Sequence, residues 1–543
     1  MVQGDETGRA ASPESWFLSS EERGNRATKI DERRGDGRPW TVGNRVETHV
    51  HGANYFRRLL EVVEGLGPAD HLYFTDWRGD HDERLDEGLE STVGSVFAAA
   101  ARRGVIVKGL LWRSHGDLAG ISTRENRHLG DVVNAAGGEV LLDMRIRFVG
   151  SHHQKLVIVR RAGRTDSDLA FVGGIDLAHG RRDDHHHHGD PQRLSMPPVY
   201  GATPPWHDVQ VEIQGPAVGD LEFTFRERWA DPTPLSSGLV RVVQAIRRRT
   251  QHLGSPLPPM PPDPVACDTK TVQVLRTYGR RRPGYPFAPE GERSIARAYM
   301  KAVRRARRLI YLEDQFLWSN EVVASFADAL TSFPQLQIIA VVPRYFDQGG
   351  LLTWPSQVGR EQAMKALLDA GGNRVRIFDV ENVEGIPVYV HAKVCVIDDV
   401  WAAVGSDNFN RRSWSHDSEI SCAVLDEARD SREPQDPAGL GDGARLYARD
   451  LRLRLWREHL DRADGDDADL LDPIQAVEKF CESAEALERW HVSGAQGKRP
   501  PGRVRPHSRF KPPRATLLWA QPLYRIVYDP DARARAMRKA GEW

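Results

Sequence analysis

Apolar positions along this chain follow two different periods in turn. An apolar residue every three or four positions, as in residues 54–66, predicts a helix, whereas a short run rich in aromatic residues, as in 71–77, predicts a strand. The same reasoning then predicts a helix, a strand and a helix over residues 92–104, 105–112 and 126–138. Strands that alternate with helices favour an α/β unit whose sheet is largely parallel and covered by helices.

This order of elements occurs again in the second half of the chain. Helices and strands are predicted in alternation over residues 294–306, 308–316, 322–333, 336–343, 360–372 and 374–380. A further pair of helices is predicted over residues 445–460 and 472–490. We therefore predict the fold class α/β, with two similar α/β lobes produced by an internal duplication.

The boundary between the copies lies where residues 254–264 contain six prolines, which exclude regular structure. The predicted division is a poorly ordered polar leader, a first lobe, a proline-rich linker, a second lobe and a basic tail, over residues 1–38, 39–250, 251–266, 267–496 and 497–543. We interpret the tail as a solvated extension. The alternative is a contact with an anionic partner, either phospholipid headgroups or nucleic acid.

Composition indicates the cellular compartment but does not identify the function. Lys and Arg number 75 against 76 Asp and Glu, so the net charge of −1 argues neither for nor against a nucleic-acid partner. The four cysteines are widely spaced and form no CxxC, which fits neither a disulfide framework nor a zinc site and favours a reducing compartment. The N-terminal residues lack the apolar core of a signal peptide, and no later run reaches the roughly 18–20 apolar residues that cross a membrane. We expect a soluble cytoplasmic protein that at most touches a membrane surface.

Each half carries one histidine–lysine pair at the same spacing. The first is His153 and Lys155 in "SHHQKLVIVRR", and the second is His391 and Lys393 in "VYVHAKVCVIDD". Alternate side chains of a strand share a face, so each imidazole is expected beside an ammonium group. An apolar strand and a glycine corner follow both pairs. Two such arrangements are difficult to assign to packing alone.

Two imidazoles that face each other suit the cleavage of a phosphodiester. One ring can attack phosphorus while the other donates a proton to the leaving oxygen, and histidine does both near neutral pH because its ordinary pKa is about 6.5. The lysines would hold the nonbridging oxygens and stabilise the charge that develops in the transition state. This chemistry requires neither a metal ion nor another cofactor, and we predict none.

These segments resemble the HxKxxxxD motif that occurs twice in the phospholipase D superfamily. The second copy is complete and ends at Asp398, whereas the first has Arg160 where the family has aspartate, with Asp166 and Asp168 nearby to support a longer hairpin. The segments "FVGGIDLAHGR", "PPWHDVQVEIQGPAVGD", "IYLEDQF" and "SWSHDSEI" are similar to the eukaryotic-type branch. The resemblance thus covers most of the chain from about Gly43.

The resemblance implies one active site shared by both lobes. It implies that His153 forms a phosphohistidine, and that His391 protonates the leaving alcohol and then activates water. It further implies that Asp208 and Glu419 each orient one histidine and that Ser406 and Asn408 bind phosphate. Asp176, at the corresponding corner of the first half, is a poorer oxyanion ligand, and Asp398 is expected to act indirectly, as a turn residue.

Two further features have open interpretations. The run "DDHHHHGD", Asp183 to Asp190, raises the possibility of a metal site, but consecutive histidines in a polar loop do not define a coordination geometry, so we favour a flexible loop. Glu313 in "YLEDQF" either lines the pocket or ends a strand.

The expected function is hydrolysis of glycerophospholipids of the phosphatidylcholine class to phosphatidic acid and a headgroup alcohol, with headgroup transfer when an alcohol replaces water. One alternative is a nuclease or other phosphodiesterase of the same superfamily, which the basic tail supports. The other is a noncatalytic lipid-binding protein that lost activity through the change at Arg160. The expected partner is phospholipid at a membrane surface, with nucleic acid less favoured, and the chain is expected to be a monomer.

Overall fold

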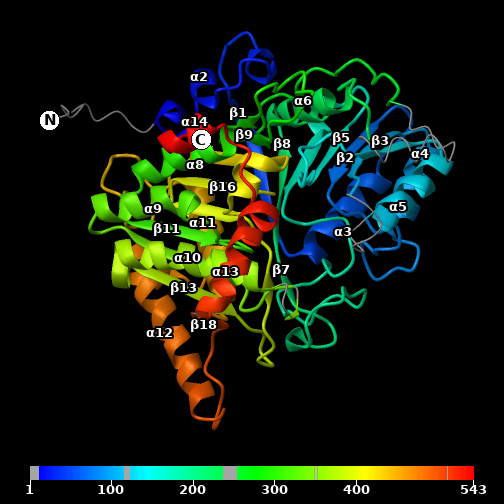
Figure 1. Cartoon of the computed structure of the whole chain (residues 1–543). Coiled ribbons are helices and arrows are strands. Elements are labelled where there is room, and N and C mark those ends of the chain that lie inside the picture. The colour runs from blue at the N-terminus through cyan, green and yellow to red at the C-terminus, as the bar shows by residue number, and fades with distance from the viewer. Residues whose placement is uncertain (1–11, 115–122, 237–252, 348, 351–352, 510–511) are drawn as a thin grey trace.

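The computed structural model describes residues 12–114, 123–236, 253–347, 349–350, 353–509 and 512–543. Its first half contains β1 (Thr41–Val50), α3 (Gly52–Glu64), β2 (His71–Asp76), α4 (Val93–Arg102), β3 (Ile106–Trp112), α5 (Thr123–Ala135), β4 (Glu139–Asp143), β5 (Leu156–Arg160), β6 (Leu169–Gly173), β7 (Trp206–His207), β8 (Val209–Gln214) and α6 (Ala217–Trp229). Figure 1 shows this half, from β1 in blue to α6, beside the other.

The second half repeats the pattern. It contains β9 (Lys270–Tyr278), β10 (Glu292–Arg293), α8 (Ser294–Arg305), β11 (Leu309–Glu313), α9 (Asn320–Ser332), β12 (Gln337–Val341), α10 (Thr353–Gly371), β13 (Val375–Val380), β14 (Tyr389–Val390), β15 (Val394–Ile397), β16 (Trp401–Gly405), β17 (Glu419–Asp426), α11 (Leu446–His459) and α12 (Pro473–Val492). Residues 253–269 between the halves contain no helix or strand.

Strand order confirms the predicted duplication. From the centre outward, the first half runs β1-β8-β6-β5-β2-β3-β4 and the second runs β9-β17-β16-β15-β11-β12-β13, so each strand has a counterpart at the same place. The two series join where β1 pairs antiparallel with β9. Away from this sheet, β7 of one half pairs in parallel with β14 of the other.

The prediction of a largely parallel sheet is wrong. Within the large sheet, only the pairs β2–β3, β3–β4, β11–β12 and β12–β13 are parallel. The remaining pairs of the path are antiparallel. The reason lies in the connections, because a helical crossover permits a parallel neighbour, whereas the turns after the histidine–lysine segments return the chain directly.

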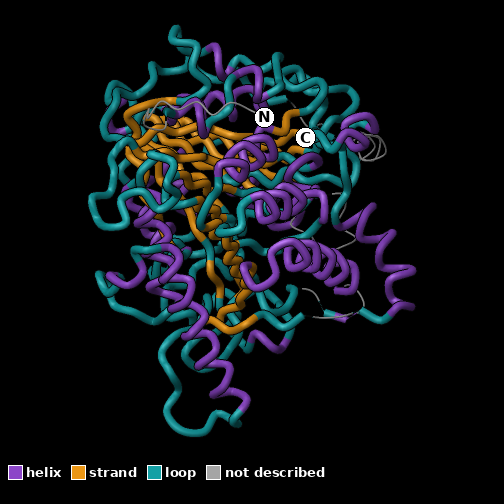
Figure 2. Tube along the Cα trace, turned by 90° about the vertical axis from the view of Figure 1, so that its left-hand side faces the viewer, coloured by secondary structure: helices purple, strands orange, loops and turns teal. Residues whose placement is uncertain are grey.

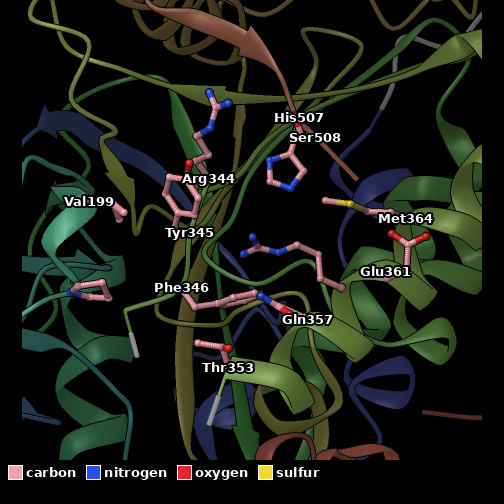
Figure 3. Close-up of a pocket in the computed structure, with 12 residues that line it drawn as sticks. Val199, Arg344, Tyr345, Phe346, Thr353, Gln357, Glu361, Met364, His507 and Ser508 are labelled. Carbon is pink, nitrogen blue, oxygen red and sulfur yellow. The ribbon is translucent and has the colours of Figure 1, made fainter. Parts of the chain in front are cut away.

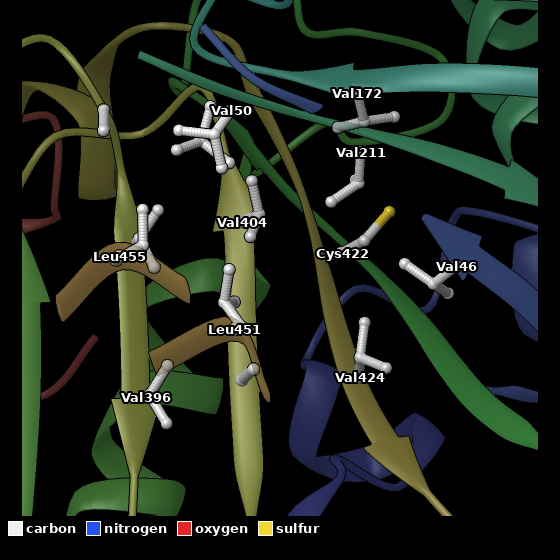
Figure 4. Packing of buried hydrophobic residues seen from close by; sticks show 14 of the residues in the cluster. Val46, Val50, Val172, Val211, Val396, Val404, Cys422, Val424, Leu451 and Leu455 are labelled. Atoms are coloured by element: carbon white, nitrogen blue, oxygen red, sulfur yellow. The ribbon is translucent and has the colours of Figure 1, made fainter. Parts of the chain in front are cut away.

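The three largest apolar clusters of the described residues hold these layers together. One lies on the outer face of the first half against α3, α4 and α5, and another on the outer face of the second half against α8, α9 and α10. The strands therefore occupy the middle of the molecule, with helices on either side (Figure 2). The third core lies between the halves, where Val172 and Val211 approach Val404 and Cys422 (Figure 4). Full burial of such side chains contributes about 1.5–3 kcal/mol each, which ties the halves to one another.

Residues 12–38 differ from the poorly ordered leader predicted for 1–38. They form α1 (Pro13–Trp16) and α2 (Ser20–Arg23), and Trp16 is fully buried in the core of the second half. Apolar side chains scattered among the polar residues explain the difference, because they find a surface that only the folded second half provides. Residues 1–11 lie outside the described part of the chain.

The C-terminal tail is likewise packed rather than extended into solvent. It adds β18 (Val504–Pro506) to the edge at β13, followed by α13 (Arg514–Leu523) and α14 (Arg535–Ala540). The final residue, Trp543, packs edge-on against Trp414 with ring centres 5.3 Å apart. Among the described residues, no helix is long and apolar enough to cross a membrane.

Candidate active site

The two histidine–lysine pairs occupy equivalent places in the duplicated fold. His153 and Lys155 come directly before β5, and His391 and Lys393 come directly before its counterpart β15. Residues 391–393 connect β14 to β15 and are not part of a strand, unlike the sequence prediction. All four side chains are largely buried, and His153, at 14% side-chain exposure, is the most accessible.

Each histidine is held by a carboxylate from the other half. Nδ1 of His153 lies 2.9 Å from Oε2 of Glu419 on β17, and Nδ1 of His391 lies 2.7 Å from Oδ2 of Asp208 after β7. A carboxylate oxygen accepts, so each ring donates from Nδ1 and keeps the lone pair of Nε2 for chemistry. Main-chain hydrogen bonds also join the two halves at both histidines. His153 N–H donates to Ser418 O at 2.9 Å, and His391 N–H donates to His207 O at 2.8 Å.

Each lysine contacts the main-chain carbonyl of the histidine in its own pair. Lys155 Nζ is 3.1 Å from Asp176 Oδ1 and donates to His153 O at 3.2 Å, while Lys393 Nζ donates to His391 O and to Gln315 Oε1. Burial lowers the pKa of Lys393 to about 8. The same Asp176 carboxylate interacts electrostatically with Lys155 and with both His153 and His391, so the two pairs converge on one region.

Burial and nearby cations also set the state of the second histidine. Desolvation, with Lys393 and Arg181 beside the ring, holds the pKa of His391 well below its ordinary value. Burial raises the pKa of its partner Asp208. Without a bound anion, His391 is therefore neutral near pH 7.

Two predicted phosphate ligands lie at the corner that follows β16. Ser406 Oγ donates to Glu419 Oε2 at 2.5 Å and accepts from the N–H of Ile420, so it steadies the carboxylate that holds His153. Asn408 is buried, and its Oδ1 has no hydrogen-bond partner among the described residues. Oδ1 is an acceptor, so only the Nδ2 group of this amide can donate to a phosphate oxygen.

Asp176, at the corner of the first half, binds cations and differs in this from Ser406 and Asn408. Its carboxylate lies 3.1 Å from both Lys155 and Arg181, so it pairs with cations and is not an oxyanion ligand. Sequence reasoning missed Arg181, whose guanidinium stacks 3.9 Å from the ring centre of Trp206, and Gln315, which contacts Lys393. The arginine that follows the glycine corner in "GGIDLAHGR" was the available signal for the first.

Asp398 lies in the turn after β15 and has a structural part. Its carboxylate accepts from the backbone N–H groups of Arg307, Arg308 and Leu309 at 2.7, 2.8 and 2.8 Å, which fixes the start of β11. These are the contacts of a turn residue, and its indirect effect on catalysis stays a prediction.

The counterpart turn of the first half replaces that arrangement with an ion pair. Arg160 Nε lies 3.0 Å from Asp168 Oδ2, and Asp168 Oδ1 accepts from the N–H of Arg161 at 2.5 Å. Asp168 therefore supports the hairpin, while Asp166 is exposed. The change at Arg160 lies at the far end of β5 from His153 and Lys155.

A separate cavity of about 200 Å³ lies near the second half and contains neither catalytic candidate (Figure 3). Arg344, Tyr345, Arg360 and His507 are in its wall. Arg344 and His507 both pair with Asp379, and Arg360 donates to three main-chain carbonyls, so these groups are already engaged. The cavity does not compete with the histidine site as a place for a phosphodiester.

Comparisons with known proteins agree with the duplicated site. A family profile described as phospholipase D matches residues 82–330, and one described as cardiolipin synthase, PLD-like domain, matches residues 302–432. Phospholipase D alpha 1 of Vigna unguiculata is 25% identical over 537 residues, covering 75% of this chain and 64% of that protein. Phospholipase D alpha 2 of Arabidopsis thaliana is 26% identical over 584 residues, covering 80% of this chain and 69% of that protein.

This chain thus spans about two thirds of the length of these relatives. Among solved structures, phosphatidylserine synthase of Haemophilus influenzae Rd KW20 aligns with 80% of this chain and 94% of its own, at 13% identity and a TM-score of 0.48. The two family profiles, the relatives and the repeated histidine–lysine pairs lead to one conclusion. The chain belongs to the phospholipase D superfamily.

Proposed function

We propose that this chain is a phosphodiesterase that hydrolyses glycerophospholipids of the phosphatidylcholine class to phosphatidic acid and a headgroup alcohol. The observation that carries the proposal is the reciprocal hold on the two histidines, His153 by Glu419 and His391 by Asp208. In the described part of the chain, Nε2 of each ring makes no hydrogen bond, and a buried lysine follows each histidine two positions on. A packing role alone does not explain why the same arrangement occurs twice, each time with a hydrogen bond between the two halves.

In the proposed reaction, Nε2 of His153 attacks phosphorus while the bond from phosphorus to the headgroup oxygen breaks. His391 gives its proton to that oxygen, and the alcohol leaves. The substrate-free ring of His391 is neutral, but an anionic phosphate between Lys155 and Lys393 offsets the positive charge that lowers its pKa. The bound substrate thus helps supply the protonation state that the first step needs.

The second step reverses the roles. His391, now neutral, takes a proton from water, and the oxygen of that water attacks phosphorus as the bond to His153 Nε2 breaks. An alcohol that replaces water gives headgroup transfer from the same phosphohistidine. Lys155, Lys393 and the amide of Asn408 hold the nonbridging oxygens throughout, and Ser406 keeps Glu419 in place.

The two alternatives lose their main sequence arguments. The tail arginines Arg499, Arg503 and Arg505 pair with acidic residues of the chain, so their charge is largely neutralised within the molecule and gives little support to a nuclease. Arg160 pairs with Asp168 away from the histidines, so the changed first motif gives little support to a loss of activity.

The test compares the wild-type chain with His153→Ala, His391→Ala and, as a matched control, His188→Ala at an exposed position. Purified proteins are incubated with phosphatidylcholine vesicles and, separately, with single-stranded DNA. Choline release by the wild type and the control but not by the two site variants, with intact DNA, supports the proposal. Cleaved DNA without choline release supports the nuclease instead.

The intermediate has its own test. Substrate labelled at phosphorus is mixed with protein and quenched with denaturant, and the position of the label is found by peptide mapping. Label on His153 is expected in the wild type. It should be absent from His153→Ala and reduced in His391→Ala, which lacks the proton donor for the headgroup oxygen. Equal turnover by the wild type and both variants would overturn the catalytic assignment.

A further inference from the structure

A second cluster of histidines lies beside the active site and takes no part in the proposed reaction. His51 follows β1, His187 lies in the loop after the first glycine corner, His207 ends β7, and Glu458 comes from α11. One ligand atom from each of these residues lies within 4.8 Å of the others. The three histidines are almost completely buried, so the cluster is part of the interior.

The run "DDHHHHGD" is a loop, as predicted, but one of its histidines is buried. His187 is fully buried, whereas His185, His186 and His188 are exposed. Asp183 is also buried, and its Oδ1 accepts from the N–H groups of Asp184 and Gly189, so the loop closes around the one inward histidine.

Distances within the cluster converge on the Glu458 carboxylate. His51 Nε2 lies 2.8 Å from Oε2, and His187 Nε2 and His207 Nδ1 lie 3.2 and 3.5 Å from Oε1. The rings of His51 and His187 meet edge-on with centres 4.8 Å apart, and those of His51 and His207 with centres 5.2 Å apart. Two ligand atoms bound to one tetrahedral zinc ion at about 2.0–2.1 Å stand roughly 3.3 Å apart. The three distances from histidine nitrogens to Glu458 oxygens are close to this value.

Carboxylates face two of these rings through both of their nitrogens. His207 has Nε2 2.8 Å from Glu313 Oε2 and Nδ1 turned to Glu458, so without an ion only the doubly protonated ring can donate to both. His187 likewise has Asp183 at 3.5 Å from Nδ1 and Glu458 at Nε2. Among the described residues, Nδ1 of His187 and Nδ1 of His207 make no hydrogen bond of good geometry.

We propose that His51, His187, His207 and Glu458 bind one divalent transition-metal ion, for which Zn²⁺ fits best. Three imidazole nitrogens and a carboxylate oxygen are the donors that Zn²⁺ takes in proteins, and they suit Mg²⁺ or Ca²⁺ poorly. The outward nitrogens of His207 and His187 then face Glu313 and Asp183, which is the carboxylate–histidine–metal arrangement that fixes ring orientation.

Glu313 extends this support to a fourth histidine. Its Oε1 lies 2.8 Å from His459 Nε2, and Tyr311 Oη donates to the same oxygen at 2.5 Å. This assigns Glu313 to the support of the metal site and leaves it no part in lining the histidine–lysine pocket.

The ion would hold the active site together without touching the substrate. His51, His187 and His207 belong to the first half and Glu458 to the second, so one ion joins both halves. His207 directly precedes Asp208, the residue that holds His391, and its carbonyl accepts from the N–H of His391. The metal ligands are therefore positioning residues, and the proposal stands whether or not the phosphodiesterase proposal does.

The first experiment measures metal content. The full chain is purified without metal-affinity resin, equilibrated with Zn²⁺, freed of unbound ion by gel filtration and analysed by elemental mass spectrometry. About one Zn²⁺ per chain is expected in the wild type and in His188→Ala, and less than about a tenth of that in His51→Ala and His187→Ala. Loss in His188→Ala with retention in His187→Ala would place the ion on the exposed run and overturn the proposal.

A second measurement covers the case in which the alanine variants do not fold. The wild-type chain is stripped with a chelator and titrated with Co²⁺, whose visible absorption is strong in four-coordinate sites. Saturation at one equivalent, with Glu313→Gln binding about 10–100-fold more weakly, is expected from the supporting carboxylate. A wild-type chain that gains no such absorption would rule the site out.

Discussion

Glu419, in the second half of the chain, lies 2.9 Å from the ring of His153 in the first half, across 266 positions of sequence. The mirror relationship joins Asp208 and His391 across 183 positions. Neither half can therefore orient its own histidine. A functional site of this kind exists only when both halves are folded and docked. Both halves contribute apolar residues to the core that lies between them, and this core stabilises the docked arrangement.

The first prediction concerns these two carboxylates. Glu419→Gln and Asp208→Asn keep the size of the side chain but replace an acceptor by an amide, so the imidazole loses the partner that fixes its tautomer. We expect kcat to fall about 10²- to 10⁴-fold, with little change in KM for phosphatidylcholine. The exposed Asp166→Asn is the control, with unchanged kinetics. A loss confined to KM would contradict an orienting role.

The second prediction is a pH dependence set by Lys393. Burial lowers the pKa of its ammonium group to about 8, so the group is cationic below that pH and loses its charge as the pH rises through it. A neutral amine does not stabilise phosphate oxygens, so kcat/KM should fall about tenfold per pH unit above the pKa.

The measurement is a pH–rate profile for choline release. In Lys393→Arg the guanidinium stays charged across the whole range, so the alkaline fall should disappear even though the maximal rate is reduced. A wild-type profile that stays level well above pH 8 would exclude this role for Lys393.

Local sequence was sufficient to find the chemistry of the site. A histidine and a lysine two positions apart need no tertiary information, and their repetition indicated the duplication that the strand order confirms. The largely parallel sheet was predicted wrongly because strands joined by helices dominate the pattern, whereas β1 and β8, which pair antiparallel, contain charged residues that hide their periodicity.

Long-range relationships were beyond the reach of that reasoning. Glu419 and Asp208 were both identified, but nothing local says which histidine each holds. The run of histidines gives a similar case, because His187 and His188 are indistinguishable in sequence and differ only in which one the folded loop turns inward. Burial of Trp16 and Trp543 also depends on surfaces formed by distant residues.

The third prediction tests whether the tail supports the folded core. Trp543 packs on Trp414, and the Arg533 guanidinium lies 3.8 Å from the ring centre of Trp543. Trp543→Ala should lower the free energy of unfolding by about 3–5 kcal/mol, as for other large-to-small changes at buried aromatic positions. Trp519→Ala, at a residue that is 43% exposed, should change it by no more than about 0.5 kcal/mol. Urea unfolding measures both, and a Trp543→Ala variant as stable as the wild type would show that this contact does not support the fold.

The fourth prediction separates structure from catalysis at the changed first motif. Arg160 is 1% exposed and lies between Asp168, at 3.0 Å, and Glu222, at 3.5 Å. Arg160→Leu removes the buried cation beside Asp168, whereas Glu222 keeps Arg226 at 2.7 Å. We expect a loss of about 3–5 kcal/mol in the free energy of unfolding, because a buried ion pair loses one partner. Arg164→Leu, at an exposed position in the same turn, should cost almost nothing. Because Arg160 lies at the far end of β5 from His153, choline release per folded molecule should be unchanged in both variants. Lost activity at unchanged stability would instead make Arg160 part of the catalytic site.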